Sequence, residues 1–143
     1  FDIIETVDDI RILKPLDSAC SEFNKKLQLM IQVNLAGETQ KSGIAPDLVP
    51  ELIKAALEFN GIRIVGLMTM PPFFDDPENA RPYFAQLRLL REKLVAEGIL
   101  DSEARELSMG MSGDFEAAIE EGATIVRIGT ALFGSRLNAP SLI

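Results

Sequence analysis

Histidine and tryptophan are absent from the 143-residue sequence. Without histidine, the chain cannot build a Ser-His-Asp triad or most of the zinc sites found in proteins, and we expect no metal site. The single cysteine, Cys20, excludes an internal disulfide and fits a reducing compartment such as the cytosol. It lies in a helical pattern among apolar residues, which predicts a small core residue. Any chemistry in this chain therefore needs another base or a cofactor.

Long apolar runs and an excess of positive charge are also missing. No run approaches the roughly 20 apolar residues that cross a bilayer, and no signal peptide is visible. The net charge of −8 argues against nucleic acid or an anionic membrane as the main partner. A small anion in a locally positive pocket remains compatible with this charge. We therefore expect a cytoplasmic protein whose partner is a small molecule.

Short apolar runs alternate with longer amphipathic stretches along the chain. The pattern predicts strands at residues 2–6, 27–34, 62–69, 106–109 and 124–128. It predicts helices at residues 8–24, 48–59, 77–97 and 114–121, and a last turn at 130–133. Pro15 should kink or restart the first helix. This alternation indicates an α/β fold of βα units on a parallel sheet, in a single domain over residues 1–143.

Two of the predicted strands carry polar side chains on one face. Gln32 and Asn34 share a face of the second strand, and Arg127 shares a face with Gly129 in the last. A parallel sheet covered by helices on both sides should be almost continuously apolar. The polar positions therefore favour a barrel interior or a ligand cleft.

Two consecutive strand-to-helix turns combine glycine with hydroxyl side chains. The first is Ser108-Met109-Gly110-Met111-Ser112, followed by Gly113, and the second is Arg127-Ile128-Gly129-Thr130. Gly110 and Gly113 would let the backbone approach a ligand, and Ser112 is expected to cap the next helix. Each turn alone could be an ordinary tight turn. Because the last two loops of βα barrels often bind phosphate, the pair predicts a phosphate site.

Three further residues at strand ends are candidates for ligand contact. Arg127 lies in an otherwise apolar run, and a buried guanidinium needs an acceptor. That acceptor could be a neighbouring carboxylate such as Glu5 or an atom of a ligand, and the spacing does not separate these alternatives. Asn34 could contact a ligand or cap the loop after it, and Met68 is expected in the core more than in a binding site.

Five segments together carry a resemblance to a known family: Ile31-Gln32-Val33-Asn34, Gln40-Lys41-Ser42-Gly43, Gly66-Leu67-Met68, Leu107-Ser108-Met109-Gly110-Met111-Ser112 and Val126-Arg127-Ile128-Gly129-Thr130. They resemble the pyridoxal phosphate homeostasis proteins, the YggS or PROSC family, which are relatives of the alanine racemase N-terminal barrel. The resemblance covers nearly the whole chain. It implies a (β/α)8 TIM barrel of fold type III, with only about the last five βα units present and strands 1–3 missing.

The resemblance also implies the cofactor, pyridoxal 5′-phosphate, and the residues that bind it. The Ser108–Ser112 loop with Gly129 and Thr130 would hold the phosphate, Arg127 would face the pyridine nitrogen, and Asn34 and Met68 would also contact the cofactor. Because arginine stays protonated, the ring nitrogen would accept a hydrogen bond and remain unprotonated, which weakens the ring as an electron sink.

In this family a lysine at the end of the first strand forms a Schiff base with the cofactor. The lysines of this chain are Lys14, Lys25, Lys26, Lys41, Lys54 and Lys93. None of them lies at the equivalent strand end, so the Schiff-base lysine is expected upstream of Phe1.

The resemblance therefore predicts a protein that binds pyridoxal phosphate for homeostasis, without catalytic residues, and that serves pyridoxal phosphate-dependent apo-enzymes. The alternatives are an amino-acid racemase, another barrel enzyme that acts on a phosphorylated substrate, or a half-barrel without a ligand. Relatives that racemise alanine use a tyrosine from a second domain, which is not expected here.

Five barrel strands alone would leave two open edges and an exposed apolar face. We therefore expect the chain to be incomplete or to pair with another copy, as a monomer or a homodimer.

Overall fold

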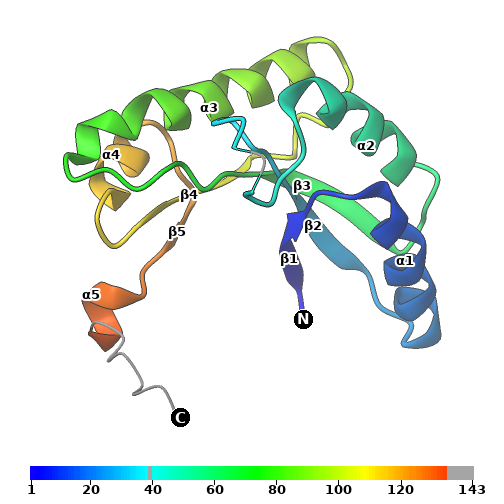
Figure 1. The fold of residues 1–143 in the computed structure, drawn as a ribbon. Coiled ribbons are helices and arrows are strands. Elements are labelled where there is room, and N and C mark those ends of the chain that lie inside the picture. Colours follow the sequence, from blue (N-terminus) through cyan, green and yellow to red (C-terminus); the bar gives the residue numbers. More distant parts are fainter. Residues whose placement is uncertain (39, 135–143) are drawn as a thin grey trace.

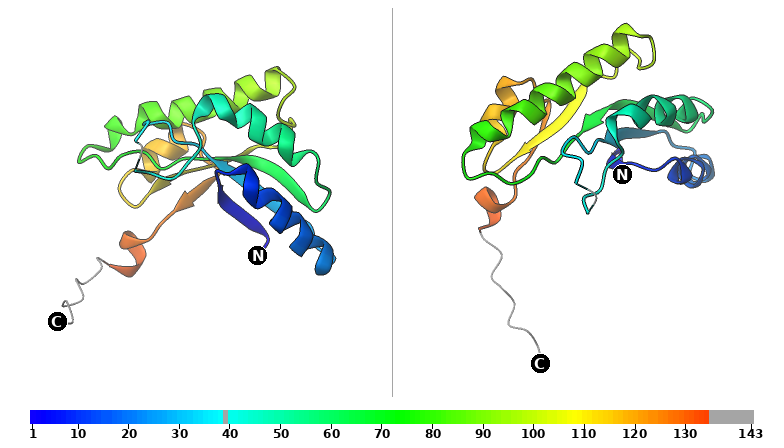
Figure 2. Two further views of the ribbon diagram at one scale, coloured as in Figure 1. Left: turned by 45° about the vertical axis from the view of Figure 1, so that its right-hand side comes forward. Right: turned by 45° about the horizontal axis from the view of Figure 1, so that its top comes forward.

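The computed structural model describes residues 1–38 and 40–134. Five parallel strands form one sheet in chain order: β1 (Ile3–Val7), β2 (Leu27–Gln32), β3 (Ile62–Met68), β4 (Glu106–Met111) and β5 (Ile125–Arg127). The helices are α1 (Leu13–Glu22), α2 (Val49–Ala56), α3 (Arg81–Ala96), α4 (Phe115–Glu120) and α5 (Thr130–Phe133). Short 3-10 turns at Ile10–Ile12, Pro46–Leu48 and Pro77–Asn79 precede α1, α2 and α3. Helices α1 to α4 cover one face of the sheet, and α5 leads away from it (Figures 1 and 2).

This arrangement is that of successive βα units of a barrel, so the predicted α/β fold is confirmed at that level. The closed eight-stranded barrel stays a prediction. None of the helices in the described residues is long and apolar enough to cross a membrane.

The main core lies between the sheet and the helices that cover it. Leu29, Ile31 and Leu67 of the strands pack there with Phe84 and Leu87 of α3, all fully buried. Cys20 is also buried in this cluster, as its helical pattern predicted. Burial of one apolar face of each helix therefore holds the helices on the sheet.

A second, smaller cluster occupies the opposite, inner face of the sheet. Met30, Val65 and Met68 are only 0%, 6% and 2% exposed. Ile3 and Ile125, from the two edge strands, pack against them. We expected an exposed apolar face, and this expectation is wrong for Met30, Val65 and Met68 because side chains of the edge strands help to cover them.

A bulge in β3 brings Val65 to the inner face. Leu29 pairs with Ile64 and Met30 with Gly66, so β3 has one extra residue at this point. Gly66 also lies against β4, where an added Cβ would be 1.9 Å from the carbonyl oxygen of Glu106. Glycine is therefore required at this position by the close approach of two strands.

The element boundaries follow the sequence pattern closely, with local differences that include the first helix and β4. The first predicted helix is divided into a 3-10 turn and α1, which begins at Leu13. Pro15 lies in the first turn of α1, where its missing N–H group costs little, so the helix restarts before the proline and not at it. Strand β4 continues to Met111 and thus includes most of the first predicted phosphate loop.

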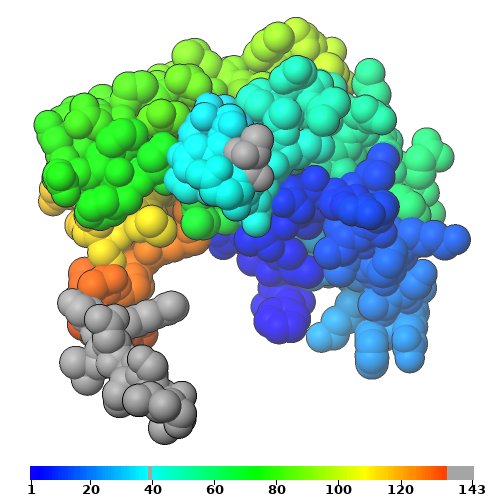
Figure 3. Space-filling model, in the orientation of Figure 1, coloured from blue at the N-terminus to red at the C-terminus, as the bar shows by residue number. Residues whose placement is uncertain are grey.

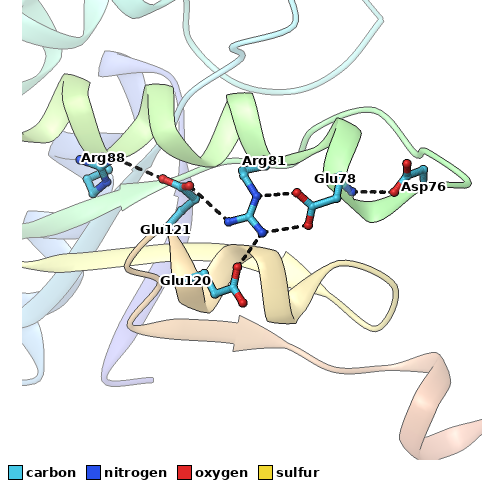
Figure 4. A network of polar contacts seen from close by, with 6 residues as sticks. All are labelled: Asp76, Glu78, Arg81, Arg88, Glu120 and Glu121. Atoms are coloured by element: carbon cyan, nitrogen blue, oxygen red, sulfur yellow. Dashed lines mark hydrogen bonds and ion pairs between the residues drawn. The ribbon is translucent and has the colours of Figure 1, made fainter.

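An ion-pair network joins α3 to α4 (Figure 4). Arg81 donates hydrogen bonds to Glu78 at 2.7 Å, to Glu120 at 2.6 Å and to Glu121 at 3.4 Å, and Arg88 also reaches Glu121. The hydrogen bond from Arg81 lowers the pKa of the Glu78 carboxyl below its ordinary value. The network holds α4, and with it the loop that precedes α4, against α3.

Candidate functional site

A pocket of about 270 Å³ opens where the loops after β3, β4 and β5 meet. Its volume lies close to the lower end of the roughly 300–1,000 Å³ range of small-molecule sites. Five predicted site residues line it: Met111, Ser112, Arg127, Gly129 and Thr130. In Figure 3, the green segment that follows β3 lies against the yellow and orange atoms of the last two units. The two predicted loops thus contribute to one pocket.

One hydroxyl group joins these two loops. Ser112 Oγ accepts hydrogen bonds from the backbone N–H groups of Gly129 and Ala131, each at 3.2 Å. Because the oxygen accepts both bonds, its own proton is left as a donor. The expectation that Ser112 caps the next helix is wrong, because Asp114 is the N-cap residue of α4 and Ser112 reaches the neighbouring loop instead. The two N–H groups are thus engaged by Ser112, and the Ser112 O–H group remains as a donor in the pocket lining.

The Arg127 guanidinium is held by two acceptors. Nη1 donates to Ser108 Oγ at 2.5 Å, and Nη2 donates to the carbonyl oxygen of Thr69 at 2.9 Å. The Ser108 hydroxyl donates in turn to Glu5 Oε2 at 2.5 Å. Arg127 therefore reaches Glu5 through a serine. A guanidinium has five N–H donors, so within the described part of the chain three of them have no protein acceptor.

Arg127 brings a positive charge to the pocket lining, and Asp114 brings a negative one. Burial lowers the pKa of Arg127, while the nearby carboxylates of Glu5 and Asp114 raise it. The ordinary pKa of arginine is so high that the side chain stays protonated at neutral pH. The guanidinium therefore favours a ligand atom that accepts hydrogen bonds.

The glycines of the first loop have different roles. Gly110 has a φ of +92°, and an added Cβ would lie 2.6 Å from the Ala118 Cβ, so glycine is needed here for the packing of α4 on β4. The expected role of Gly110 in ligand approach stays a prediction. A Cβ on Gly113 or Gly129 would meet nothing within 4 Å, and both residues line the pocket.

Five predicted contact residues lie outside the pocket lining, and one of them is Gly110. Ser108 is fully buried beneath Arg127, and the Met109 side chain is fully buried in the main core. Met68 belongs to the inner-face cluster, which agrees with its expected place in a core. Asn34 Nδ2 donates to the carbonyl oxygen of Glu38 at 2.8 Å, so it holds the loop after β2, which was the alternative expectation. Contact between these residues and a ligand stays a prediction.

The sequence reasoning missed the third wall of the pocket, which is formed by the loop after β3. Pro72, Phe73 and Phe74 lie there. Phe74 stacks on Tyr83 with a centroid distance of 5.9 Å, whereas Phe73 is 85% exposed. The loop follows the carboxyl end of a strand, where βα barrels bind ligands, and this position was the signal that could have identified it.

Asp114 was also missed. It lines the pocket, and its Oδ1 accepts a hydrogen bond from the Met111 N–H group at 2.6 Å. This bond fixes the loop between β4 and α4. In residues 1–38 and 40–134, no group of three or more His, Cys, Asp or Glu side chains could hold a metal ion. The site thus offers hydrogen-bond donors, one guanidinium and aromatic walls, which suits binding of an aromatic phosphate.

The family description "Alanine racemase, N-terminal domain" matches residues 1–137. The chain belongs to the alanine racemase N-terminal domain family. Among curated members of similar sequence, the pyridoxal phosphate homeostasis protein of Aquifex aeolicus (strain VF5) is 44% identical, over 94% of this chain and 58% of the relative. The protein of the same name from Vibrio alginolyticus is 41% identical, over 95% of this chain and 57% of the relative.

Solved structures agree with this membership of the alanine racemase N-terminal domain family. The PipY protein of Synechococcus elongatus PCC7942, solved with PLP bound, matches with a TM-score of 0.82 and 32% identity, over 94% of this chain and 61% of PipY. The resemblance to pyridoxal phosphate homeostasis proteins that the sequence motifs indicated is thus confirmed. The chain spans less than three fifths of the length of the two curated relatives.

Proposed function

We propose that this chain binds pyridoxal 5′-phosphate and takes part in its homeostasis without turning over a substrate. The phosphate would lie at the Ser108–Ser112 loop with Gly129 and Thr130, and Arg127 would face the pyridine nitrogen. The chain would form part of a TIM barrel whose remaining units, with the lysine that binds the cofactor covalently, belong to a longer protein. The full protein would act in the cytoplasm, as a monomer or homodimer, and supply apo-enzymes that need the cofactor.

One observation carries this proposal: the Ser112 hydroxyl unites the two loops at the pocket that Arg127 also lines. The Ser112 O–H group would then donate to the phosphate, and Arg127 to the ring nitrogen, of one ligand in this pocket. The names of the relatives and the PLP bound to PipY support the same ligand.

The cofactor would supply an aldehyde and an electron-withdrawing pyridine ring. Arg127 would donate a hydrogen bond to the ring nitrogen, and because arginine does not give up its proton at neutral pH, the nitrogen would stay unprotonated. An unprotonated ring withdraws electrons less strongly, which supports binding over catalysis.

Equilibrium dialysis against pyridoxal 5′-phosphate, with and without excess inorganic phosphate, tests the binding. We expect saturable uptake that phosphate reduces, and uptake that is absent or insensitive to phosphate would contradict the proposal. The same protein is then incubated with D- and L-amino acids while optical rotation is followed. Sustained racemisation would overturn the non-catalytic role and favour the racemase alternative.

A further inference from the structure

Glu5 lies far from the pocket along the sheet but is connected to it across the inner face. Its strand, β1, is an edge strand, and β2 and β3 separate it from β4. Even so, Glu5 Oε2 accepts a hydrogen bond from the Ser108 hydroxyl of β4 at 2.5 Å. The side chain therefore crosses the concave face of the sheet to reach the residue that holds Arg127.

The direction of this chain of hydrogen bonds is fixed by the chemistry of its members. An arginine only donates, and an ionised carboxylate only accepts. The single Ser108 proton must therefore go to Glu5, which leaves a lone pair of the serine oxygen for Arg127 Nη1. Without Glu5, the buried hydroxyl could turn its proton elsewhere, including toward the guanidinium.

Two fixed acceptors on different nitrogen atoms determine how the guanidinium lies. Ser108 Oγ holds Nη1 and the Thr69 carbonyl oxygen holds Nη2, so the plane of the group is set and the remaining N–H donors have defined directions. Ser108 is fully buried and Glu5 and Arg127 are partly buried, so their charges interact more strongly than at an exposed site.

We infer that Glu5 is a positioning residue, which acts through the Ser108 hydroxyl to hold the Arg127 guanidinium in the orientation that recognises the ring of the ligand. This inference rests on the proposed function, because it assigns a ring-binding role to Arg127. It separates two parts of recognition. Glu5 controls contact with the ring, whereas Ser112 and the loop that it holds control contact with the phosphate.

The test compares Glu5→Ala, Glu5→Gln and the control Glu22→Ala, which removes the same charge from an exposed position of α1. The probes are 4-deoxypyridoxine 5′-phosphate, which has the ring and phosphate but no aldehyde, and inorganic phosphate. Affinities are measured by titration calorimetry on the full chain. Nitrogen-15 NMR of the Arg127 side chain reports, without any ligand, whether rotation of the guanidinium is restricted.

We expect Glu5→Ala to weaken binding of the ring-containing probe about tenfold, the usual effect of losing a hydrogen bond to a charged group. Its affinity for inorganic phosphate should change less than about twofold, because the phosphate donors are untouched. Glu5→Gln retains an acceptor for Ser108 and should restore most of the loss. The Arg127 signals should show restricted rotation in the wild type and Glu5→Gln, and averaged rotation in Glu5→Ala.

Equal affinity of wild type and Glu5→Ala for the ring-containing probe, with unchanged Arg127 signals, would overturn the inference and leave the proposed function intact. If the wild type does not bind this probe, the proposed function fails, and the Arg127 signals alone decide the positioning role. If Glu5→Ala does not fold, Glu5→Asp replaces it, because the shorter carboxylate keeps the charge but cannot reach Ser108. Glu5→Asp should then lose the same affinity for the ring-containing probe. Wild-type affinity with unchanged Arg127 signals in Glu5→Asp would overturn the inference.

Discussion

The hydroxyl oxygen of Ser112 lies 3.2 Å from the backbone nitrogen of Gly129. Ser112 belongs to the loop after β4 and Gly129 to the loop after β5, so this hydrogen bond fixes the distance between two loops that are 17 residues apart in sequence. Together with the bond from Ala131, it holds the loop after β5 against Ser112 and leaves the Ser112 O–H group as a donor. The proposed phosphate site depends on that arrangement.

Replacement of Ser112 by alanine should therefore weaken binding of inorganic phosphate. The change removes the hydroxyl donor and the oxygen that holds Gly129 and Ala131 in place. We expect affinity to fall about tenfold, as for loss of one hydrogen bond to an anion. Isothermal titration calorimetry checks this. Ser102→Ala, in an exposed turn, is the matched control and should bind like the wild type.

Replacement of Arg127 by methionine should weaken binding of the ring more than binding of the phosphate. Methionine keeps much of the side-chain length but removes the donors and leaves Ser108 and Glu5 without their cation. We expect at least a tenfold loss for 4-deoxypyridoxine 5′-phosphate and a smaller loss for inorganic phosphate. Arg63→Met, at an exposed position of β3, controls for the loss of charge. Equal losses for both probes would contradict a ring-binding role of Arg127.

Much of the fold could be predicted from the sequence, because each strand and helix has a clear apolar period. The four covering helices and five strands lie within a few residues of the predicted ranges. The start of α1 differs from the prediction, which placed a kink or restart at Pro15. Proline is tolerated in the first turn of a helix, so the position of Pro15 does not fix where the helix starts. The burial of Met68 followed from the same apolar pattern.

The site could be located from the sequence but its contacts could not. A serine such as Ser112 can cap a helix or bond to a neighbouring loop. Only the packing of β4 beside β5 decides between these two roles. Glu5 was one of the predicted acceptors for Arg127, but in the structure Ser108 lies between the two side chains. This arrangement depends on the curvature of the sheet, which local sequence does not encode. The wall formed by Phe73 and Phe74 depends on the path of a loop with no regular pattern.

Gly110 and Gly113 should differ sharply in their tolerance of alanine. A Cβ at Gly110 would clash with Ala118 at 2.6 Å and would occupy a backbone with a φ of +92°, whereas a Cβ at Gly113 meets nothing within 4 Å. We expect Gly110→Ala to lower the free energy of unfolding by about 2 kcal/mol or more, and Gly113→Ala to leave it nearly unchanged. Urea unfolding followed by circular dichroism measures both. Similar unfolding of the two variants would contradict the packing role of Gly110.

The network around Arg81 should make stability depend on pH. The hydrogen bond from Arg81 lowers the pKa of Glu78 from its ordinary value of 4.5. A carboxyl group with a lowered pKa stabilises the folded state above its ordinary pKa, and this contribution is lost as the pH falls through the lowered value. The urea midpoint should therefore fall between about pH 6 and pH 3, and part of this fall should disappear in Arg81→Met.

Lys93→Met is the control for that experiment, because Lys93 is exposed and lies 3.9 Å from its partner Glu97. It should keep the pH dependence of the wild type. A fall in the urea midpoint that is as large in Arg81→Met as in the wild type would show that the network does not contribute. High salt should reduce the difference between Arg81→Met and wild type, since exposed ion pairs are screened.

The central claim is that the loops after β4 and β5 form one phosphate site beside Arg127. Two-dimensional ¹H–¹⁵N NMR of the chain during a titration with 4-deoxypyridoxine 5′-phosphate tests it most directly. The account predicts saturable shifts at the backbone amides of Met111–Asp114 and Gly129–Ala131, together with the Arg127 side chain, and a subset of them with inorganic phosphate. Shifts that are absent from these segments, or that lie mainly elsewhere in the chain, would contradict it.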